Sequence, residues 1–217
     1  IQDSDKVIVM GHKLPDMDAV GASIGVLKAA QLCGREGYIV LEDVNPSIQR
    51  LMAEVKKHED IFKWFITPDE AMEIVTERSL IVVVDTHRAS MVANPKLLEV
   101  NRRIVVVDHH RRGEEFIKDP ILIYLEPYAS STCELITELL QYLQERVALD
   151  AFEATVLLAG MIVDTKSFMH RTGARTFEAA SFLRRNGADA ALVQNMLKED
   201  LHSYIAKAEI IKHAQIL

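Results

Sequence analysis

The stretch RIVVVDHHRR, residues 103–112, decides the fold that this sequence predicts. Its run of β-branched residues, 104–107, is too short for a helix and is typical of a buried strand. An aspartate, two histidines and two arginines follow directly. Polar and charged side chains crowded at the end of a buried strand are costly unless something compensates them. The sequence therefore predicts that this strand delivers Asp108, His109 and His110 to a site that holds suitable partners.

Apolar runs of similar length alternate with helix-like segments along the rest of the chain. The predicted strands are residues 6–10, 38–41, 80–84, 103–107 and 121–125. The predicted helices are residues 16–32 and 47–57, one beginning at Thr67, residues 131–145, 151–163 and 175–186, and one from residue 190. Strands interleaved with helices need crossover connections, which favour parallel pairing. We expect an α/β fold with a mostly parallel sheet of about five strands, flanked by helices and followed by a helical C-terminal portion.

The composition is that of a globular protein: 49% of the 217 residues are apolar, and the net charge is −7. No apolar run approaches the ~20 residues that span a bilayer, and no signal peptide is visible. Two cysteines, Cys33 and Cys133, are too few for a disulfide framework and suit a cytoplasmic setting. The acidic balance argues against binding of long nucleic acids. Because the first residue is Ile1, we expect a fragment of a longer protein, one without membrane contact of its own.

Two further predicted strands end, like the one quoted above, in side chains that can bind metals. One is followed by His12 and another by Asp85. Ligands of parallel sheets bind beyond the carboxyl ends of the strands, so we expect these residues to converge in space. Asp16 and Asp18 complete the pattern H-x-x-x-D-x-D, and Asp164 ends the apolar segment AGMIVD.

Carboxylates and imidazoles without thiolates suit Mn²⁺, Mg²⁺ or Fe²⁺. So many acids at one place would repel one another and protonate unless cations offset them, which favours two metal ions. Two neighbouring metals activate water and stabilise displacement at phosphorus. Taken singly, an aspartate after a strand is most often a helix N-cap, and a histidine beside it is often a surface group. The combination favours a dinuclear metal site.

Four segments carry a resemblance to a known family: GHKLPDMD, VVVDTHR, VVVDHHRR and AGMIVDTKSF. Together they resemble the DHH phosphoesterase superfamily. The longer stretches GHKLPDMDAVGASIG and DTKSFMHRTGARTFEAASFLRRNGAD are most similar to the DHH domain of GdpP/YybT-type cyclic di-AMP phosphodiesterases. The resemblance extends over essentially the whole chain.

The resemblance implies a role for each residue of the predicted site. His12, Asp16 and Asp85 would hold one Mn²⁺ ion, with Mg²⁺ or Fe²⁺ as other candidates. The second ion would be held by four residues, with Asp85 bridging the two ions: Asp18, Asp85, His109 and Asp164. His110 would orient or protonate the scissile phosphate. Asp108 would fix an imidazole, as histidines that bind metals require.

The resemblance also implies domains that these residues lack. Members of the family carry a second domain, DHHA1, with a glycine- and histidine-rich substrate-binding motif, and no such GGGH-like stretch occurs here. We expect residues 1–190 to form the DHH catalytic domain and residues 191–217 a helical linker towards DHHA1. Membrane helices, a PAS domain and a degenerate GGDEF domain would precede them. The chain would then be the cytosolic part of a membrane-anchored protein, which is a possible homodimer.

Five arginines lie beside the predicted ligands, and each could pair with phosphate oxygens or only neutralise an aspartate. They are Arg88, Arg111, Arg112, Arg171 and Arg175. Residues 130–132, at a predicted helix start, could offer backbone amides to a phosphate or only cap the helix.

The predicted function is a metal-dependent phosphodiesterase that opens cyclic di-AMP to pApA by attack of a hydroxide bridging the two metals. An oligoribonuclease or phosphatase of the same superfamily, acting on short linear nucleotides, is the nearest alternative. A regulatory domain that binds a cyclic dinucleotide without hydrolysing it is another. The complete set of ligands argues against this last reading, because a sensor would tolerate loss of the bridging acid.

Overall fold

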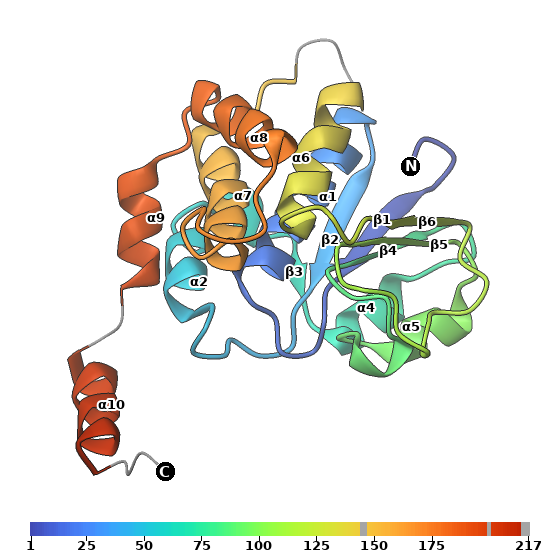
Figure 1. Ribbon diagram of the computed structural model, residues 1–217. Helices are drawn as coiled ribbons and strands as arrows, with labels where there is room; N and C mark the ends of the chain where they lie inside the picture. Colours follow the sequence, from blue (N-terminus) through green and yellow to red (C-terminus); the bar gives the residue numbers. More distant parts are fainter. Residues whose placement is uncertain (144–146, 199–200, 214–217) are drawn as a thin grey trace.

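The computed structural model describes residues 1–143, 147–198 and 201–213 and has one parallel β-sheet with helices on both faces (Figure 1). Six strands pair in the order β3-β2-β1-β4-β5-β6, and every pairing is parallel. The strands are β1 (Lys6–Met10), β2 (Glu36–Val40), β3 (Phe65–Ile66), β4 (Leu80–Val84), β5 (Ile104–Asp108) and β6 (Leu122–Leu125). The predicted α/β class is confirmed. The predicted sheet lacked β3, whose two residues are too few to show a pattern.

The central strands are rich in β-branched residues, which suits strands that are covered by helices on both faces. All five residues of β4 are buried, as a strand in the middle of a parallel sheet requires. Alternate residues of β1 enter different cores. Val7 and Val9 pack into the larger one, whereas Ile8 and Met10 pack into the smaller one on the opposite face.

The helices around the site described below pack their buried side chains into the larger core. The helices of the described chain are α1 (Met17–Leu32), α2 (Gln49–Val55), α3 (Glu59–Phe62), α4 (Pro68–Ile74), η1 (Ala89–Met91), α5 (Pro95–Val100), α6 (Thr132–Leu143), α7 (Ala151–Asp164), α8 (Ala174–Arg185), α9 (Ala190–Leu197) and α10 (Leu201–His213). Helices α1, α6 and α7 contribute buried side chains to the larger core, and α4 and α5 contribute to the smaller one.

Local chemistry explains where several helices begin. Thr67 caps α4: its hydroxyl accepts from the backbone N–H of Glu70, and the Glu70 carboxylate accepts from the backbone N–H of Thr67. This start was predicted. The predicted helix 47–57 is shorter in the structure because Asn45 accepts a hydrogen bond from the backbone N–H of Ser47, which forms a turn before α2.

The C-terminal part differs from one continuous helix. Val193 and Met196 of α9 are buried in the larger core, whereas α10 stands away from the rest of the fold (Figure 1). The end of the predicted helix 131–145 and parts of the predicted linker 191–217 lie outside the described residues.

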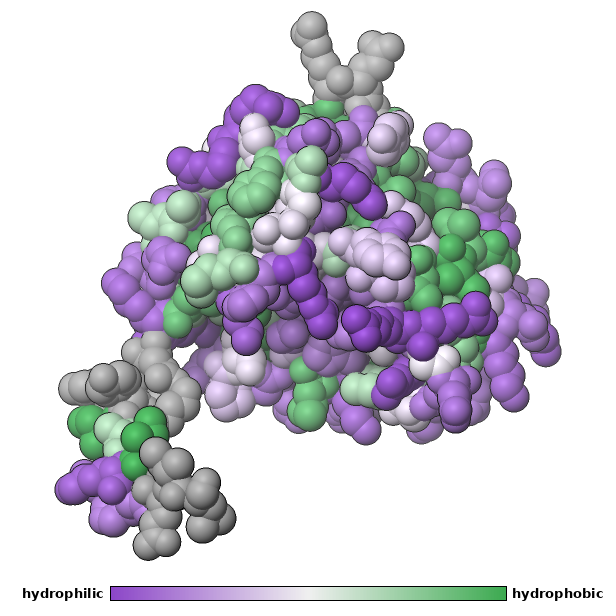
Figure 2. Space-filling model, in the orientation of Figure 1, coloured by the Kyte–Doolittle hydropathy of each residue, from purple (hydrophilic) through white to green (hydrophobic). Residues whose placement is uncertain are grey.

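The surface is mostly hydrophilic on the face drawn in Figure 2, and hydrophobic area gathers towards β6. The exposed residues Ile121, Leu122 and Ile123 belong to this edge of the sheet. Among the described helices, none has the length and apolar character needed to cross a membrane.

Candidate metal centre

A pocket of about 1100 Å³ lies beyond the carboxyl ends of β1, β4 and β5. His12, Asp85 and His109, which follow these three strands, all line it. Parallel pairing brings the three strand ends together although they are distant in sequence. The pocket therefore lies at the edge of the sheet where the sequence predicts a site.

One group of possible metal ligands consists of His12, Asp16 and Asp85. His12 Nε2 lies 3.4 Å from Asp85 Oδ2 and 4.0 Å from Asp16 Oδ1. Asp16 is also the N-cap of α1, because its Oδ1 accepts from the backbone N–H groups of Asp18 and Ala19. The capping function and the position beside His12 are thus combined in one carboxylate.

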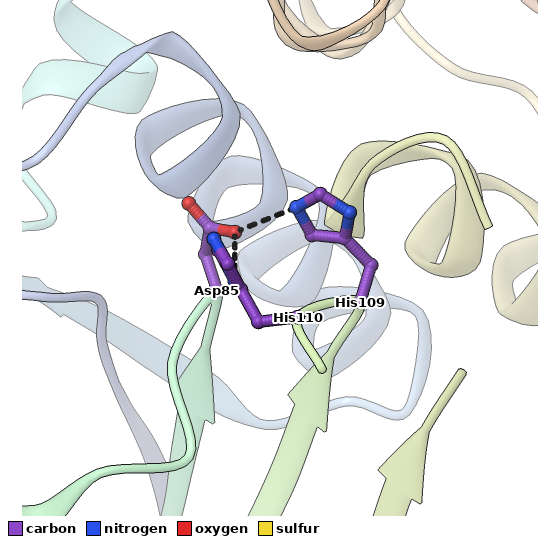
Figure 3. Close-up of side chains that lie close together, drawn as sticks. All are labelled: Asp85, His109 and His110. Carbon is purple, nitrogen blue, oxygen red and sulfur yellow. Dashed lines mark ion pairs between the residues drawn. The ribbon is translucent and has the colours of Figure 1, made fainter. Parts of the chain in front are cut away.

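A second group consists of Asp18, His109 and Asp164. His109 Nε2 lies 3.0 Å from Asp164 Oδ2 and 3.9 Å from Asp18 Oδ2. It also lies 3.5 Å from Asp85 Oδ1, and Figure 3 shows this contact from β5 to the end of β4. The structure therefore brings together all six predicted ligands.

Asp85 joins these two groups, and it also belongs to a third possible group, with His109 and His110. Its Oδ2 faces His12, whereas its Oδ1 faces His109. The residue is almost completely buried and has a φ of 61°, in the left-handed region that non-glycine residues rarely adopt. Such backbone strain persists only where the surroundings hold it, and it is common at functional sites. The strained turn directs one carboxylate towards both groups.

The charges of the site are poorly balanced by protein groups alone. Burial and the neighbouring Asp85 carboxylate raise the pKa of Asp18 well above its usual value. Burial acts in the same direction on Asp85, but the neighbouring imidazoles of His109 and His12 outweigh it and hold the pKa of Asp85 below its usual range. Burial opposes the charging of His109, yet the Asp164 and Asp85 carboxylates raise its pKa to about 11.

The donor atoms fit divalent cations. Both ring nitrogens of His109 are buried, and neither makes a hydrogen bond of good geometry with any residue that the structure describes. A buried imidazole without hydrogen bonds among three carboxylates is costly, and a metal ion would remove that cost. Imidazole and carboxylate donors without thiolate suit Mn²⁺, Mg²⁺ or Fe²⁺.

His110 lies on the open side of this arrangement, with 54% of its side chain exposed. Asp108 Oδ1 accepts from both the backbone N–H and Nδ1 of His110, at 3.0 and 2.8 Å. This hydrogen bond raises the pKa of His110, although partial burial acts against it. Asp108 is fully buried, and its hydrogen bonds hold the His110 ring in place.

Residues 6–161 match the family described as "DHH family, N-terminal domain". The chain belongs to the DHH family. It is 56% identical over 215 residues to "Cyclic-di-AMP phosphodiesterase GdpP" of Bacillus subtilis, which covers 98% of this chain and 33% of that protein. It is 50% identical to "Cyclic-di-AMP phosphodiesterase PdeA" of Listeria monocytogenes, covering 100% of this chain and 33% of that protein. The chain thus spans about a third of the length of these relatives.

The fold is also similar to that of a solved structure. An exopolyphosphatase-related protein from Bacteroides fragilis superposes with a TM-score of 0.82 at 18% identity, covering 99% of this chain and 63% of that one. At this identity the similarity describes the fold alone.

The DHH pocket contains four of the five predicted arginines: Arg88, Arg111, Arg112 and Arg171. Arg175 is placed elsewhere. Its guanidinium makes two hydrogen bonds to the Glu138 carboxylate, at 2.8 and 2.6 Å, and it is absent from the pocket lining.

Two residues that support the DHH site were not predicted. The buried His87 binds Asp108, and the Thr132 hydroxyl donates to Asp85 Oδ1 at 3.0 Å. The backbone N–H groups of Thr132 and Cys133 donate to the Asp18 carboxylate at 2.7 and 2.9 Å. Of the three amides predicted to offer a phosphate site, those of Ser130 and Thr132 thus donate to carboxylates of the protein, Glu134 and Asp18. His87 could have been singled out from the sequence because it lies in the segment DTHR, two residues after Asp85.

Proposed function

We propose that this DHH domain is the catalytic part of a metal-dependent phosphodiesterase that hydrolyses cyclic di-AMP to pApA. The observation that carries the proposal is the position of Asp85, with one oxygen towards His12 and the other towards His109. The named activities of the GdpP and PdeA relatives support the choice of substrate.

Two divalent cations, Mn²⁺ in our proposal, would be held by the two groups of ligands. His12, Asp16 and Asp85 would hold one. Asp18, Asp85, His109 and Asp164 would hold the other. When bound, such a pair of cations supplies Lewis-acid stabilisation of the negative charge that develops on a phosphoryl group. Mg²⁺ or Fe²⁺ would suit the same donors.

His110 acts on the phosphate in this proposal. It lines the pocket and is tethered at Nδ1 to Asp108, so its other ring nitrogen, Nε2, is available to a substrate. From there it would orient the scissile phosphate or donate a proton to the leaving oxygen. Asp108 keeps the ring orientation and stabilises the protonated imidazole.

The arginines that line the pocket would bind phosphate oxygens that the metals do not reach. Arg88, Arg111, Arg112 and Arg171 provide planar guanidinium groups that suit bidentate contacts with phosphate. Arg175 would contribute to phosphate binding only after leaving Glu138. The exposed Tyr128 on the pocket lining offers an aromatic ring to a base.

A cyclic dinucleotide has two phosphodiesters and two bases, so part of its affinity would come from a DHHA1 domain that follows residues 191–217. We propose residues 1–190 as the catalytic unit of such a protein. Its larger form would be anchored to a membrane with this domain in the cytosol, and a homodimer is compatible with that arrangement.

The test is hydrolysis of a substrate panel by the Mn²⁺-loaded protein, with products separated by chromatography. The panel contains cyclic di-AMP, cyclic di-GMP, pApA, a short oligoribonucleotide and adenosine 3′,5′-bisphosphate. Conversion of cyclic di-AMP to pApA as the preferred reaction would support the proposal. Preference for the linear substrates would favour an oligoribonuclease or phosphatase, and binding of cyclic di-AMP without turnover would favour a regulatory domain.

A further inference from the structure

His87 is a buried histidine that belongs to none of the possible metal groups among the described residues. It follows Asp85 by two residues and is 2% exposed. Its Nδ1 lies 2.5 Å from Asp108 Oδ2, and its Nε2 lies 3.1 Å from the backbone nitrogen of Gly113. Both nitrogens therefore have partners, in contrast to those of His109.

These two partners determine which nitrogen carries the hydrogen. The backbone N–H of Gly113 can only donate, so Nε2 of His87 must be the acceptor. The hydrogen is then on Nδ1, which donates to the Asp108 carboxylate. His87 is neutral in this arrangement and bridges a donor on one side to an acceptor on the other.

The contact with Asp108 extends to His110. Asp108 uses Oδ2 for His87 and Oδ1 for the backbone and side chain of His110. Because the two oxygens belong to one planar group, His87 restricts rotation of the carboxylate. The orientation of the His110 ring in the pocket therefore depends on His87.

The other side of His87 holds the segment that carries two pocket arginines. Besides the Gly113 contact, the backbone carbonyl of His87 accepts from the N–H of Ile117 at 2.9 Å. The His87 ring stacks on Phe116 with centroids 5.1 Å apart. The guanidinium of Arg112 lies over the same Phe116 ring, 5.0 Å from its centroid.

We propose that His87 is a positioning residue with two separable functions, resting on the phosphodiesterase function above. Through Nδ1 it orients Asp108 and, with it, His110. Through Nε2 and its ring it fixes residues 111–117, which present Arg111 and Arg112 to the substrate. The first function affects the chemical step, and the second affects substrate binding.

Two substitutions separate these functions. His87→Asn places an amide nitrogen near the position of Nδ1, so it retains a donor to Asp108 but loses the acceptor for Gly113. His87→Gln places an amide oxygen near Nε2, so it retains the acceptor but loses the donor. We expect H87N to raise KM about tenfold with kcat within about threefold of the parent. We expect H87Q to lower kcat by about 10², as for loss of an oriented acid–base group, with KM little changed.

His58→Asn is the matched control. His58 also stacks on a phenylalanine, Phe152, at 3.8 Å, but it does not line the pocket. We expect H58N to leave kcat and KM unchanged, and all three variants to retain the metal content of the parent. If H87N and H87Q lowered kcat and raised KM to the same extent, or if either variant lost bound metal, His87 would be shown only to support folding.

Two further measurements keep this test separate from that of the substrate. Kinetics are recorded with cyclic di-AMP and with bis(4-nitrophenyl) phosphate, a small generic phosphodiester. Hydrolysis of the generic ester alone would overturn the proposed substrate but leave the His87 comparison intact. Histidine ¹⁵N NMR of the unmodified, Mg²⁺-loaded protein gives the tautomer directly. A hydrogen on Nδ1 of His87 is expected, and a hydrogen on Nε2 would overturn the inference even if no variant folded.

Discussion

The hydroxyl of Thr132 lies 3.0 Å from Asp85 Oδ1 and donates a hydrogen bond to it. The two residues come from the start of α6 and the end of β4, 47 positions apart. The same residue, through its backbone N–H, holds Asp18. One position at a helix start thus orients a carboxylate shared by both groups of ligands and a carboxylate of the second group.

The first prediction concerns this hydroxyl. Thr132→Val replaces it with a methyl group of similar size and leaves the backbone N–H in place. We expect Mn²⁺ affinity to fall by about tenfold, since groups that orient metal ligands typically contribute 10- to 100-fold. Titration calorimetry measures the change. Thr132→Ser keeps the hydroxyl and should bind Mn²⁺ like the parent, and equal affinity in all three proteins would contradict the role of Thr132.

The second prediction concerns the shared carboxylate. Asp85→Ala removes the only side chain that faces both His12 and His109 among the described residues, so occupancy should fall in both sites. Elemental analysis after dialysis should find less than half of the parent's Mn²⁺, and hydrolysis should be nearly abolished. The exposed Asp69→Asn change is the control and should alter neither. Full occupancy in D85A would mean that Asp85 bridges nothing.

A third prediction separates the two neighbouring histidines. His109→Ala should lose metal from the second group, because His109 lies among Asp18, Asp85 and Asp164. His110→Ala should keep both ions and lower kcat by about 10²–10⁴, the usual effect of losing an acid–base group. Metal content and kcat are measured for both variants. The assignment would be reversed if H110A, and not H109A, lost metal.

Gly160 on α7 leads to a fourth prediction. A Cβ at this position would lie 2.5 Å from Cys133 Sγ and 2.9 Å from Asp18 Cα. Gly160→Ala should therefore push α7 away from the Asp18 region, destabilise the fold by about 1–3 kcal/mol and weaken the second metal group. Thermal unfolding and Mn²⁺ titration report the two effects. In Gly173→Ala, the added methyl group meets no atom within 4 Å, so the midpoint of unfolding should hardly change.

The fifth prediction concerns substrate affinity. Remote contacts position a scissile bond as well as hold the substrate. A longer chain that continues into a DHHA1 domain should therefore exceed these 217 residues in kcat/KM for cyclic di-AMP by several powers of ten, while binding the same number of Mn²⁺ ions. Steady-state kinetics of the two proteins compare them. Equal kcat/KM would mean that the residues of this pocket bind the whole dinucleotide unaided.

Much of the fold was predictable because its central strands are local features of the sequence. The runs LIVVV (80–84) and RIVVV (103–107) are continuous and β-branched, and they correspond to β4 and β5 within one residue. β6 is exposed over half its length, and β3 has only two residues. The spacing of apolar residues along the sequence therefore identifies neither strand well.

The sequence by itself determined the edge of the sheet at which the site lies, because parallel strands place their carboxyl ends together wherever they fall in the chain. That rule was sufficient to group His12, Asp85 and His109. It does not determine which group each neighbouring side chain faces. Whether an arginine reaches the pocket, as Arg171 does, or binds a helix carboxylate, as Arg175 does, depends on the packing of α6 against α8.

Only the tertiary structure decided the contacts that hold the ligands in place. Thr132 meets Asp18 across 114 residues of sequence, and His87 meets Asp108 across 21. The strained φ of Asp85 directs its carboxylate towards both His12 and His109. Hydrogen bonds form only within about 3 Å and in particular directions, so they depend on backbone positions set by the whole packed core. A pattern of residue types carries the chemistry of the donors, but their orientation comes from the fold.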